Sequence, residues 1–209
     1  QVGMDRYTDP DFNPLGGATS DKRSTYYFAK DKSGNYVIQK YRPSNSTART
    51  YAYQDDVHIY IYRGSELYFM LAEALNNLGR VTEASALINQ GVNGSFPNGF
   101  TDDWTGASTL GTRRYPDLGI RGAFNLGNRE FTRGDARAND EAILDEMMLE
   151  FPAEGKIYPT MIRMARRYND PSIIADRVCP KYADPEAIRA KINAEVGGKA
   201  GYFVHWNLK

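Results

Sequence analysis

Asp102, Asp103 and Trp104 are consecutive in a Gly-rich segment, and Tyr115 follows in the same segment. An indole ring offers a flat apolar platform, and neighbouring carboxylates accept hydrogen bonds from hydroxyl groups. This combination could hold a sugar ring. We therefore predict that these four residues contact a ligand and that Trp104 is substantially exposed. The alternative is that Trp104 packs its segment onto the helices, since tryptophan is more often packed than displayed.

A second group of residues could perform acid–base chemistry. Three glutamates recur at four-residue intervals and share one helical face: Glu146, Glu150 and Glu154. Three arginines follow in the next predicted helix: Arg163, Arg166 and Arg167. Glycoside hydrolysis needs carboxylates that converge across a cleft from different elements, which one helical face does not provide. The pattern favours an ion-pair seam between helices, and we predict no catalytic residues and no enzymatic activity.

Calcium ligands are the next candidates. Asp9, Asp11 and Asn13 alternate as oxygen ligands do in calcium loops. However, Pro14 occupies the sixth position, which such loops reserve for glycine, and no closing glutamate follows. An ordinary Asx-turn loop is the simpler interpretation. We expect no metal and no cofactor.

The overall composition excludes further classes of function. The 209 residues contain 26 Lys plus Arg and 26 Asp plus Glu, so no global field attracts nucleic acid or an anionic membrane. No apolar run reaches the length of a membrane span. Cys179 is the single cysteine, and His58 and His205 have no further His or Cys at ligand spacing, which disfavours zinc.

The region 63–93 predicts two short antiparallel helices joined at Gly79. Apolar residues at helical spacing form one stripe on each helix. The first stripe comprises Leu67, Met70, Leu71, Ala74, Leu75 and Leu78, and the second comprises Val81, Ala84, Leu87 and Ile88. Such a tight helical hairpin is typical of a tetratricopeptide unit. A single unit must stack on another surface, so we expect the members of the first stripe from Leu67 to Ala74 to be buried.

Other segments flank this helix pair. Residues 24–62 predict a β-hairpin, with strands at 24–30 and 36–41, and a further strand at 55–62. Residues 94–139 form a long, aromatic-rich segment that we predict to be an ordered loop. The whole chain, 1–209, is expected to be one domain that is mainly α-helical.

Residues 140–196 predict further helices, of which those within 140–168 should form a second antiparallel pair. Ile143, Met147 and Phe151 belong to an apolar stripe that should be buried, and Asn139 or Asp140 is a plausible N-cap. The last helix should begin at Asp184 as the cap, with Pro185 at its first position.

Three stretches, taken in this order, resemble signatures of the SusD/RagB family. They are "IYIYRGSELYFMLAEALNNLGRVTEASALIN", "AILDEMMLEFPAEGKIYPTMIRMAR" and "RRYNDPSIIADRVCPKY" followed by a helix and "GYFVHWNLK". The resemblance spans roughly residues 24–209 and rests on order and spacing more than on identity. Within the second signature, Met147, Ile157 and Pro159 stand where the family carries an arginine, a second basic residue and an aspartate.

The resemblance implies a tetratricopeptide-like fold and a non-catalytic role. Members are outer-membrane lipoproteins of Bacteroidetes that capture nutrients, mostly glycans, for a TonB-dependent transporter of the SusC type. The chain then looks like the C-terminal portion of a longer protein, whose lipid anchor lies outside it. The ligand would be an oligosaccharide or a peptide, and nucleic acid is not expected. The alternative is an intracellular helical-repeat adaptor that binds a protein partner.

Overall fold

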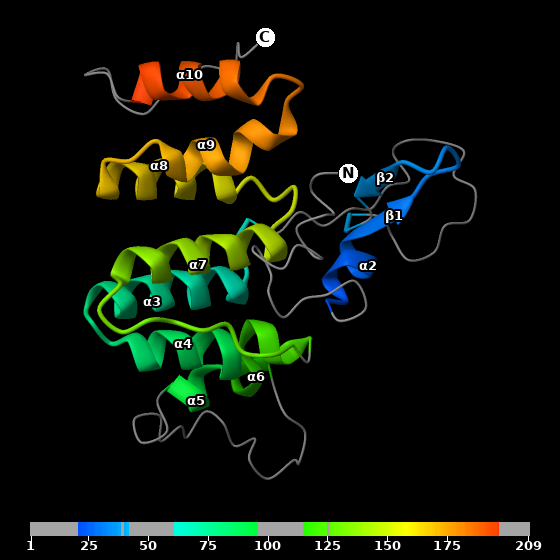
Figure 1. Cartoon of the computed structure of the whole chain (residues 1–209). Helices are drawn as coiled ribbons and strands as arrows, with labels where there is room; N and C mark the ends of the chain where they lie inside the picture. The colour runs from blue at the N-terminus through cyan, green and yellow to red at the C-terminus, as the bar shows by residue number, and fades with distance from the viewer. Residues whose placement is uncertain (1–20, 39, 42–60, 96–114, 125, 197–209) are drawn as a thin grey trace. The chain divides into compact units, whose positions relative to one another are not determined.

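The structure, a computed structural model, describes residues 21–38, 40–41, 61–95, 115–124 and 126–196. Figure 1 shows a mainly α-helical chain with one small antiparallel β-hairpin, which confirms the predicted fold class. The chain forms two compact units. The N-terminal unit ends at Gly134, and the C-terminal unit begins at Asp135. The single-domain organisation stays a prediction.

The β-hairpin is shorter than the sequence predicted. Strand β1 (Phe28–Lys30) pairs with strand β2 (Tyr36–Ile38) in antiparallel register. Residues 24–27, predicted as strand, belong instead to helix α2 (Arg23–Tyr27). The cause is local, because the Asp21 carboxylate accepts a hydrogen bond from the Arg23 amide at 3.0 Å and so starts a helical turn. The strand predicted at 55–62 lies almost entirely outside the described residues.

The helix pair predicted at 63–92 is present. Helix α3 (Gly64–Asn77) packs on helix α4 (Val81–Gln90), and Gly79 ends α3 with φ of 76°. The amides of Gly79 and Arg80 donate to carbonyl groups of the last turn of α3, at 2.9 and 2.8 Å. These two bonds are those of a Schellman motif, in which a left-handed residue satisfies the final helix carbonyls.

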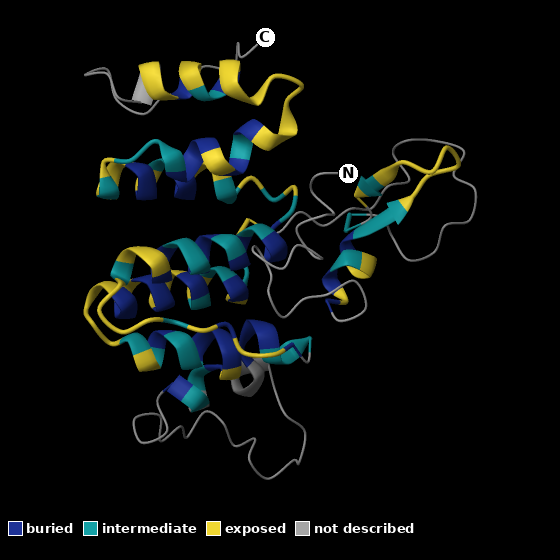
Figure 2. Cartoon of the chain, in the orientation of Figure 1, coloured by how far each residue is buried: buried dark blue, intermediate teal, exposed yellow. Residues whose placement is uncertain are grey.

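The stripe that we predicted to be buried on α3 is largely exposed, so that part of the prediction is wrong. Leu67 is 63% exposed and Met70 is 59% exposed, and Leu71, Ala74 and Leu78 are exposed as well. The buried face lies to the side of this stripe (Figure 2). It comprises Ser65, Phe69, Ala72, Glu73, Leu75 and Asn76. Apolar residues surround most of α3, so their spacing does not determine which side is covered.

Gly79→Ala should destabilise the protein by about 1 kcal/mol, since alanine adopts positive φ only with strain. A Cβ at this position would meet nothing within 4 Å, so the backbone conformation is the whole cost. The midpoint of urea unfolding measures it. An unchanged midpoint would show that the turn tolerates alanine and that the left-handed conformation is not needed.

The segment between the two predicted helix pairs contains regular structure that the sequence did not predict. Helix α5 (Val92–Ser95) follows α4 directly, and helix α6 (Tyr115–Ala123) lies inside the range 94–139 that was expected to be a loop. Both contact α4. Gly119 interrupts α6 with non-helical angles, and this break separates two short helical pieces too brief to produce a periodic pattern.

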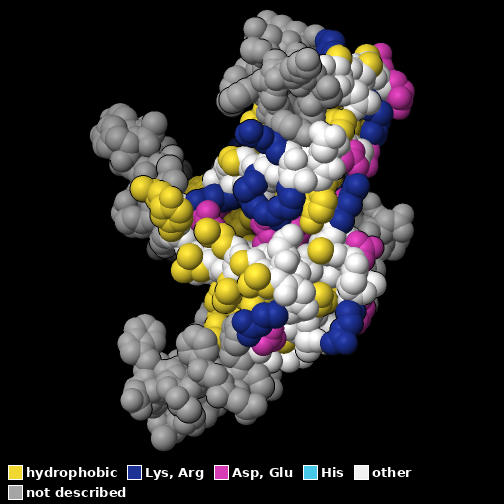
Figure 3. Space-filling model, turned by 90° about the vertical axis from the view of Figure 1, so that its left-hand side faces the viewer, with side chains coloured by type: hydrophobic (Ala, Val, Ile, Leu, Met, Phe, Trp, Pro, Cys, Tyr) yellow, Lys and Arg dark blue, Asp and Glu magenta, His cyan; other side chains and the backbone are white. Residues whose placement is uncertain are grey.

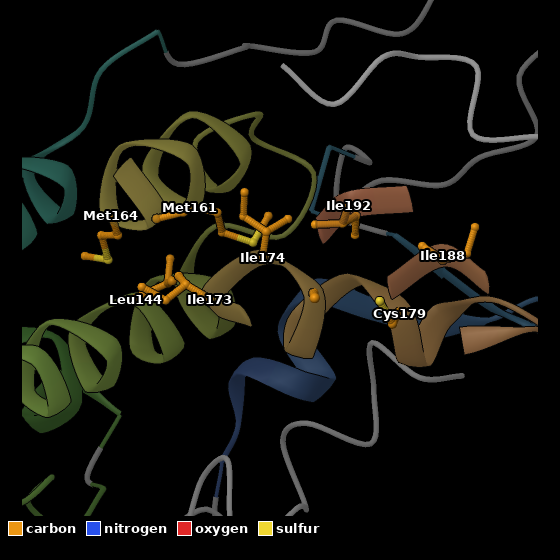
Figure 4. Close-up of a cluster of buried hydrophobic side chains, with 10 residues drawn as sticks. Leu144, Met161, Met164, Ile173, Ile174, Cys179, Ile188 and Ile192 are labelled. Carbon is orange, nitrogen blue, oxygen red and sulfur yellow. The ribbon is translucent and has the colours of Figure 1, made fainter. Parts of the chain in front are cut away.

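The described part of the C-terminal unit contains four α-helices in sequence. They are α7 (Ala136–Glu150), α8 (Ile157–Tyr168), α9 (Ser172–Val178), which continues into a short 3₁₀ helix (Cys179–Lys181), and α10 (Pro185–Val196). Each helix packs on the next. Their shared core is the cluster drawn in Figure 4: Leu144, Met161, Met164, Ala165, Ile173, Ile174, Ala175, Cys179, Ile188 and Ile192. Ile143, Met147 and Phe151 are buried, as predicted.

Helix starts in this unit were predicted with mixed success. Helix α7 begins earlier than expected, because the Asp135 carboxylate caps it by accepting from the Ala138 amide at 2.9 Å. Asn139 and Asp140, the predicted caps, are buried inside the helix. The start of α10 is as predicted, with Asp184 accepting from the Ala187 amide at 3.0 Å.

Candidate functional site

Most of the ligand-binding residues predicted from the sequence lie outside the described residues. Asp102, Asp103 and Trp104 are not among the described residues, and neither are the calcium candidates or the two histidines. Tyr115 is the first residue of α6, but its side chain is likewise outside the description. The ligand contact and the exposure of Trp104 therefore stay predictions.

Within the described part of the N-terminal unit, a cleft of about 370 Å³ opens along α4. One wall is a face of α4 and carries Thr82, Ser85, Asn89 and Gln90. The other wall is the irregular segment that follows α6 and carries Asn128, Glu130, Phe131 and Arg133. Small-molecule pockets span about 300–1,000 Å³, so this volume suits a small ligand or one residue of a larger one.

The second wall has no regular secondary structure, so specific contacts must fix its course. The first is a close backbone approach between α6 and the end of α4. A Cβ at Gly119 would lie 2.6 Å from the Gly91 nitrogen and 2.7 Å from the Ile88 carbonyl oxygen. Only glycine permits this approach. It places the chain beside α4 before the wall begins.

Two polar side chains then hold the wall itself. Arg121 is buried, and its Nε donates to the Gly127 carbonyl at 2.7 Å. Asn89, also buried, accepts from the Arg129 amide at 2.8 Å and donates to the Arg129 carbonyl at 3.0 Å. A side-chain amide that bonds both groups of one residue replaces the pairing that a neighbouring strand would supply.

The cleft presents both hydrogen-bond donors and acceptors. Glu130 only accepts and Arg133 only donates, while the amides of Gln90 and Asn128 do both. Among the residues that the structure describes, neither Glu130 nor Arg133 has a hydrogen-bonded or ionic side-chain partner. Sugar hydroxyls donate and accept at once, so this set matches a hydroxyl-rich ligand. The half-buried ring of Phe131 adds apolar area to the cleft.

Charged residues of the C-terminal unit join its helices, and Arg167, one of the arginines named above, takes part. The pairing of the three glutamates with the three arginines stays a prediction. The fully buried carboxylate of Asp140 on α7 accepts from Arg167 Nη1 at 2.8 Å and from the Tyr168 hydroxyl at 2.7 Å, both on α8. Burial raises the pKa of Tyr168 to about 12, and its hydrogen bond to Asp140 acts in the same direction.

The seam extends to α9 through Arg177. Its Nε donates to Asp145 at 2.8 Å, and its terminal nitrogens lie 3.4 Å from Glu141. The side chain is 8% exposed, so this pair is partly desolvated and orients α9 on α7. On the surface shown in Figure 3, basic and acidic side chains also lie beside one another, and hydrophobic side chains reach the surface.

Two of the three glutamates considered for acid–base chemistry are inaccessible, and Glu154 is half-buried. Glu146 and Glu150 are buried within α7, at 0% and 1% exposure. A glycosidase needs two carboxylates that reach the substrate from opposite sides. Likewise, no group of three or more potential metal ligands occurs in the part of the chain that is described.

The sequence of the chain is similar to that of a known protein family. A sequence model of the family described as "SusD family" matches residues 18–195. The chain belongs to the SusD family. No curated protein and no solved structure matches it. The matched range includes both helix pairs and every residue of the cleft.

The SusD family is a family of binding proteins that are generally non-catalytic. Its members bind nutrients at the cell surface in association with transport, and they are typically outer-membrane lipoproteins. No described helix combines the length and the apolar character that membrane crossing needs.

Proposed function

We propose that this chain binds glycans at the bacterial cell surface for delivery to a SusC-like TonB-dependent outer-membrane transporter. Membership in the SusD family supports the class of function, and the cleft along α4 is the observation that carries the proposal to particular residues. Among the described residues, Glu130, Arg133 and the side-chain amides of Gln90 and Asn128 offer acceptors and donors side by side, which the hydroxyl groups of a sugar can satisfy. A peptide is the other ligand class under this function.

Asp102, Asp103, Trp104 and Tyr115 are proposed to contribute to the same ligand surface. In sequence they join α5 to α6, and both of these helices contact α4. Trp104 lies nine positions after Ser95, and an extended chain covers about 30 Å over nine residue steps. The connection therefore allows Trp104 to reach the cleft and to supply the aromatic platform that its described walls provide only through Phe131.

The localisation is part of the same proposal. The protein would be a Bacteroidetes surface lipoprotein that is held at the membrane by a lipid anchor. The upstream gene sequence should then encode a signal peptide with a lipidated cysteine, and a transporter gene should lie next to it.

Trp104→Ala should weaken glycan binding at least 10-fold while leaving the melting temperature nearly unchanged, because an exposed ring contributes contact area to the ligand and little to the core. A glycan array identifies the ligand, and calorimetry with that ligand gives the two dissociation constants. Trp206→Ala is the matched control, since it removes the other of the two tryptophans. It should leave binding intact.

The opposite result would have a definite meaning. If Trp104→Ala lowers the melting temperature and spares binding, then Trp104 packs its segment against the protein. The ligand would in that case be held by other residues.

A second candidate function is an adaptor that binds a protein partner through its helices. The observation in its favour is the apolar stripe of α3, where Leu67, Met70, Leu71 and Leu78 are exposed. Exposed apolar patches often mark protein contacts. An intracellular adaptor would lack the lipidated leader and the neighbouring transporter gene, so the same gene sequence distinguishes the two functions.

A further inference from the structure

We propose that Asn89 is the positioning residue of the cleft: it fixes the wall that carries Asn128 and Glu130 against α4, and it does so through the main chain of Arg129. The inference rests on the proposed function, because it assigns a role in the ligand site of that function. Asn89 itself is buried and so acts through the residues that it places.

The geometry of the Asn89 amide is that of a β-ladder pair. Its oxygen lies 2.8 Å from the Arg129 amide nitrogen, and its nitrogen lies 3.0 Å from the Arg129 carbonyl oxygen. The same nitrogen lies 3.2 Å from Ser85 Oγ, one helical turn earlier on α4. The two bonds to Arg129 fix the orientation of the amide, because both would be lost if its oxygen and nitrogen exchanged places.

This docking determines which side chains face the ligand. In an extended segment, alternate side chains point in opposite directions. Arg129 is buried at 7% exposure, whereas its neighbours Asn128 and Glu130 are exposed and line the cleft. Holding the Arg129 main chain against α4 therefore turns both neighbours toward the cleft.

Asn89 holds the wall at a point beyond the bond from Arg121. Arg121 holds the chain at Gly127, and Asn89 holds it two residues later. The segment from Leu126 to Phe131 belongs to no helix or sheet. Since it has no ladder, the side-chain bonds determine how far Glu130 stands from the face of α4.

The test uses Asn89→Asp and Asn89→Ser. Aspartate keeps an acceptor for the Arg129 amide but places a carboxylate oxygen against the Arg129 carbonyl, which breaks the pair. Serine is the milder variant, since it leaves no buried charge if the aspartate variant fails to fold. Asn77→Ser is the matched control, because Asn77 is exposed on α3, its side-chain amide donates to the Glu73 carbonyl one turn earlier, and it does not line the cleft.

Two measurements are needed. Hydrogen exchange without ligand should show that the Arg129 amide exchanges at least 10-fold faster in the Asn89 variants than in the wild type or the control. Calorimetry with neutral oligosaccharides of glucose, xylose and mannose as probes should show about 10-fold weaker binding in the same variants.

A double-mutant cycle with Glu130→Gln distinguishes positioning from a general loss of stability. If Asn89 acts by placing Glu130, then Glu130→Gln weakens binding in the wild type and has little further effect in the Asn89 variants. Additive losses would overturn the inference, as would unchanged exchange at Arg129.

The inference and the proposed function fail in different ways. Binding that Glu130→Gln weakens and Asn89→Ser does not would leave the function standing and overturn the role of Asn89. If no probe, including a peptide mixture, binds the wild type, the proposed function is contradicted. Exchange at Arg129 then still shows whether Asn89 holds the wall.

Discussion

Replacing Gly119 with alanine should lower the free energy of unfolding by about 3–5 kcal/mol, the sum of backbone strain and overpacking. Gly119 has φ of 62° and ψ of −172°, a region that only glycine occupies without strain. The new methyl group would also lie within 2.8 Å of backbone atoms at the end of α4. Backbone atoms of a packed helix end cannot move aside as a flexible side chain can.

Gly79→Ala is the matched comparison, because both glycines have positive φ but Gly79 faces open space. The difference between the two midpoints of urea unfolding isolates the close contact of α6 with α4. Equal effects would show that this contact is dispensable. Gly119→Ala should also weaken ligand binding, since α6 leads directly into the cleft wall.

Asp140→Ala should destabilise the C-terminal unit by about 3 kcal/mol, because it removes a fully buried carboxylate that accepts two charge-assisted hydrogen bonds from α8. Arg167 and the Tyr168 hydroxyl both donate to this carboxylate. Asp176→Ala is the control, because Asp176 pairs with Arg189 at 59% side-chain exposure and should cost at most about 1 kcal/mol. Similar losses in the two variants would contradict the structural weight given to Asp140.

The same site predicts a dependence on alkaline pH. The pKa of Tyr168 is raised from 10.0 in the unfolded chain to about 12 in the folded state, so the folded state holds this proton more tightly. The stability linked to it is complete below pH 10 and is lost as the pH rises toward 12. Tyr168→Phe should reduce this loss, as urea unfolding across that range would show. Tyr158→Phe, which changes an exposed tyrosine of the same helix, is the control.

Long helices with a repeated apolar spacing could be predicted from the sequence, and the short helices α5 and α6 could not. Both helix pairs and the cap of α10 follow from periodic stripes and from capping residues close in sequence. The buried side of α3 could not be predicted from the sequence. Leu67 and Phe69 are both apolar, and only the tertiary arrangement determines that Phe69 is buried and Leu67 is exposed. The early start of α7 was missed because Asp135 competed with Asn139 and Asp140, which are equally good caps in isolation.

The candidate site was harder to predict from the sequence than the fold. Thr82, Ser85 and Asn89 form a polar stripe on α4, but such a stripe ordinarily indicates a solvated helix face. Glu130 and Arg133 become part of a site only because the chain returns to α4. That return depends on contacts between residues forty positions apart, such as Asn89 with Arg129. The predicted contacts at Trp104 and its neighbours remain to be tested.

The cleft wall that follows α6 can change its side chains without losing its attachment to α4. Its attachment uses the main chain of Arg129, which every residue type except proline would offer in the same form. The side chains at positions 128, 130, 131 and 133 are therefore free to vary without loosening the attachment. Selectivity in this cleft can be retuned by simple substitution in one wall, while the helix pair that supplies the other wall retains its stability.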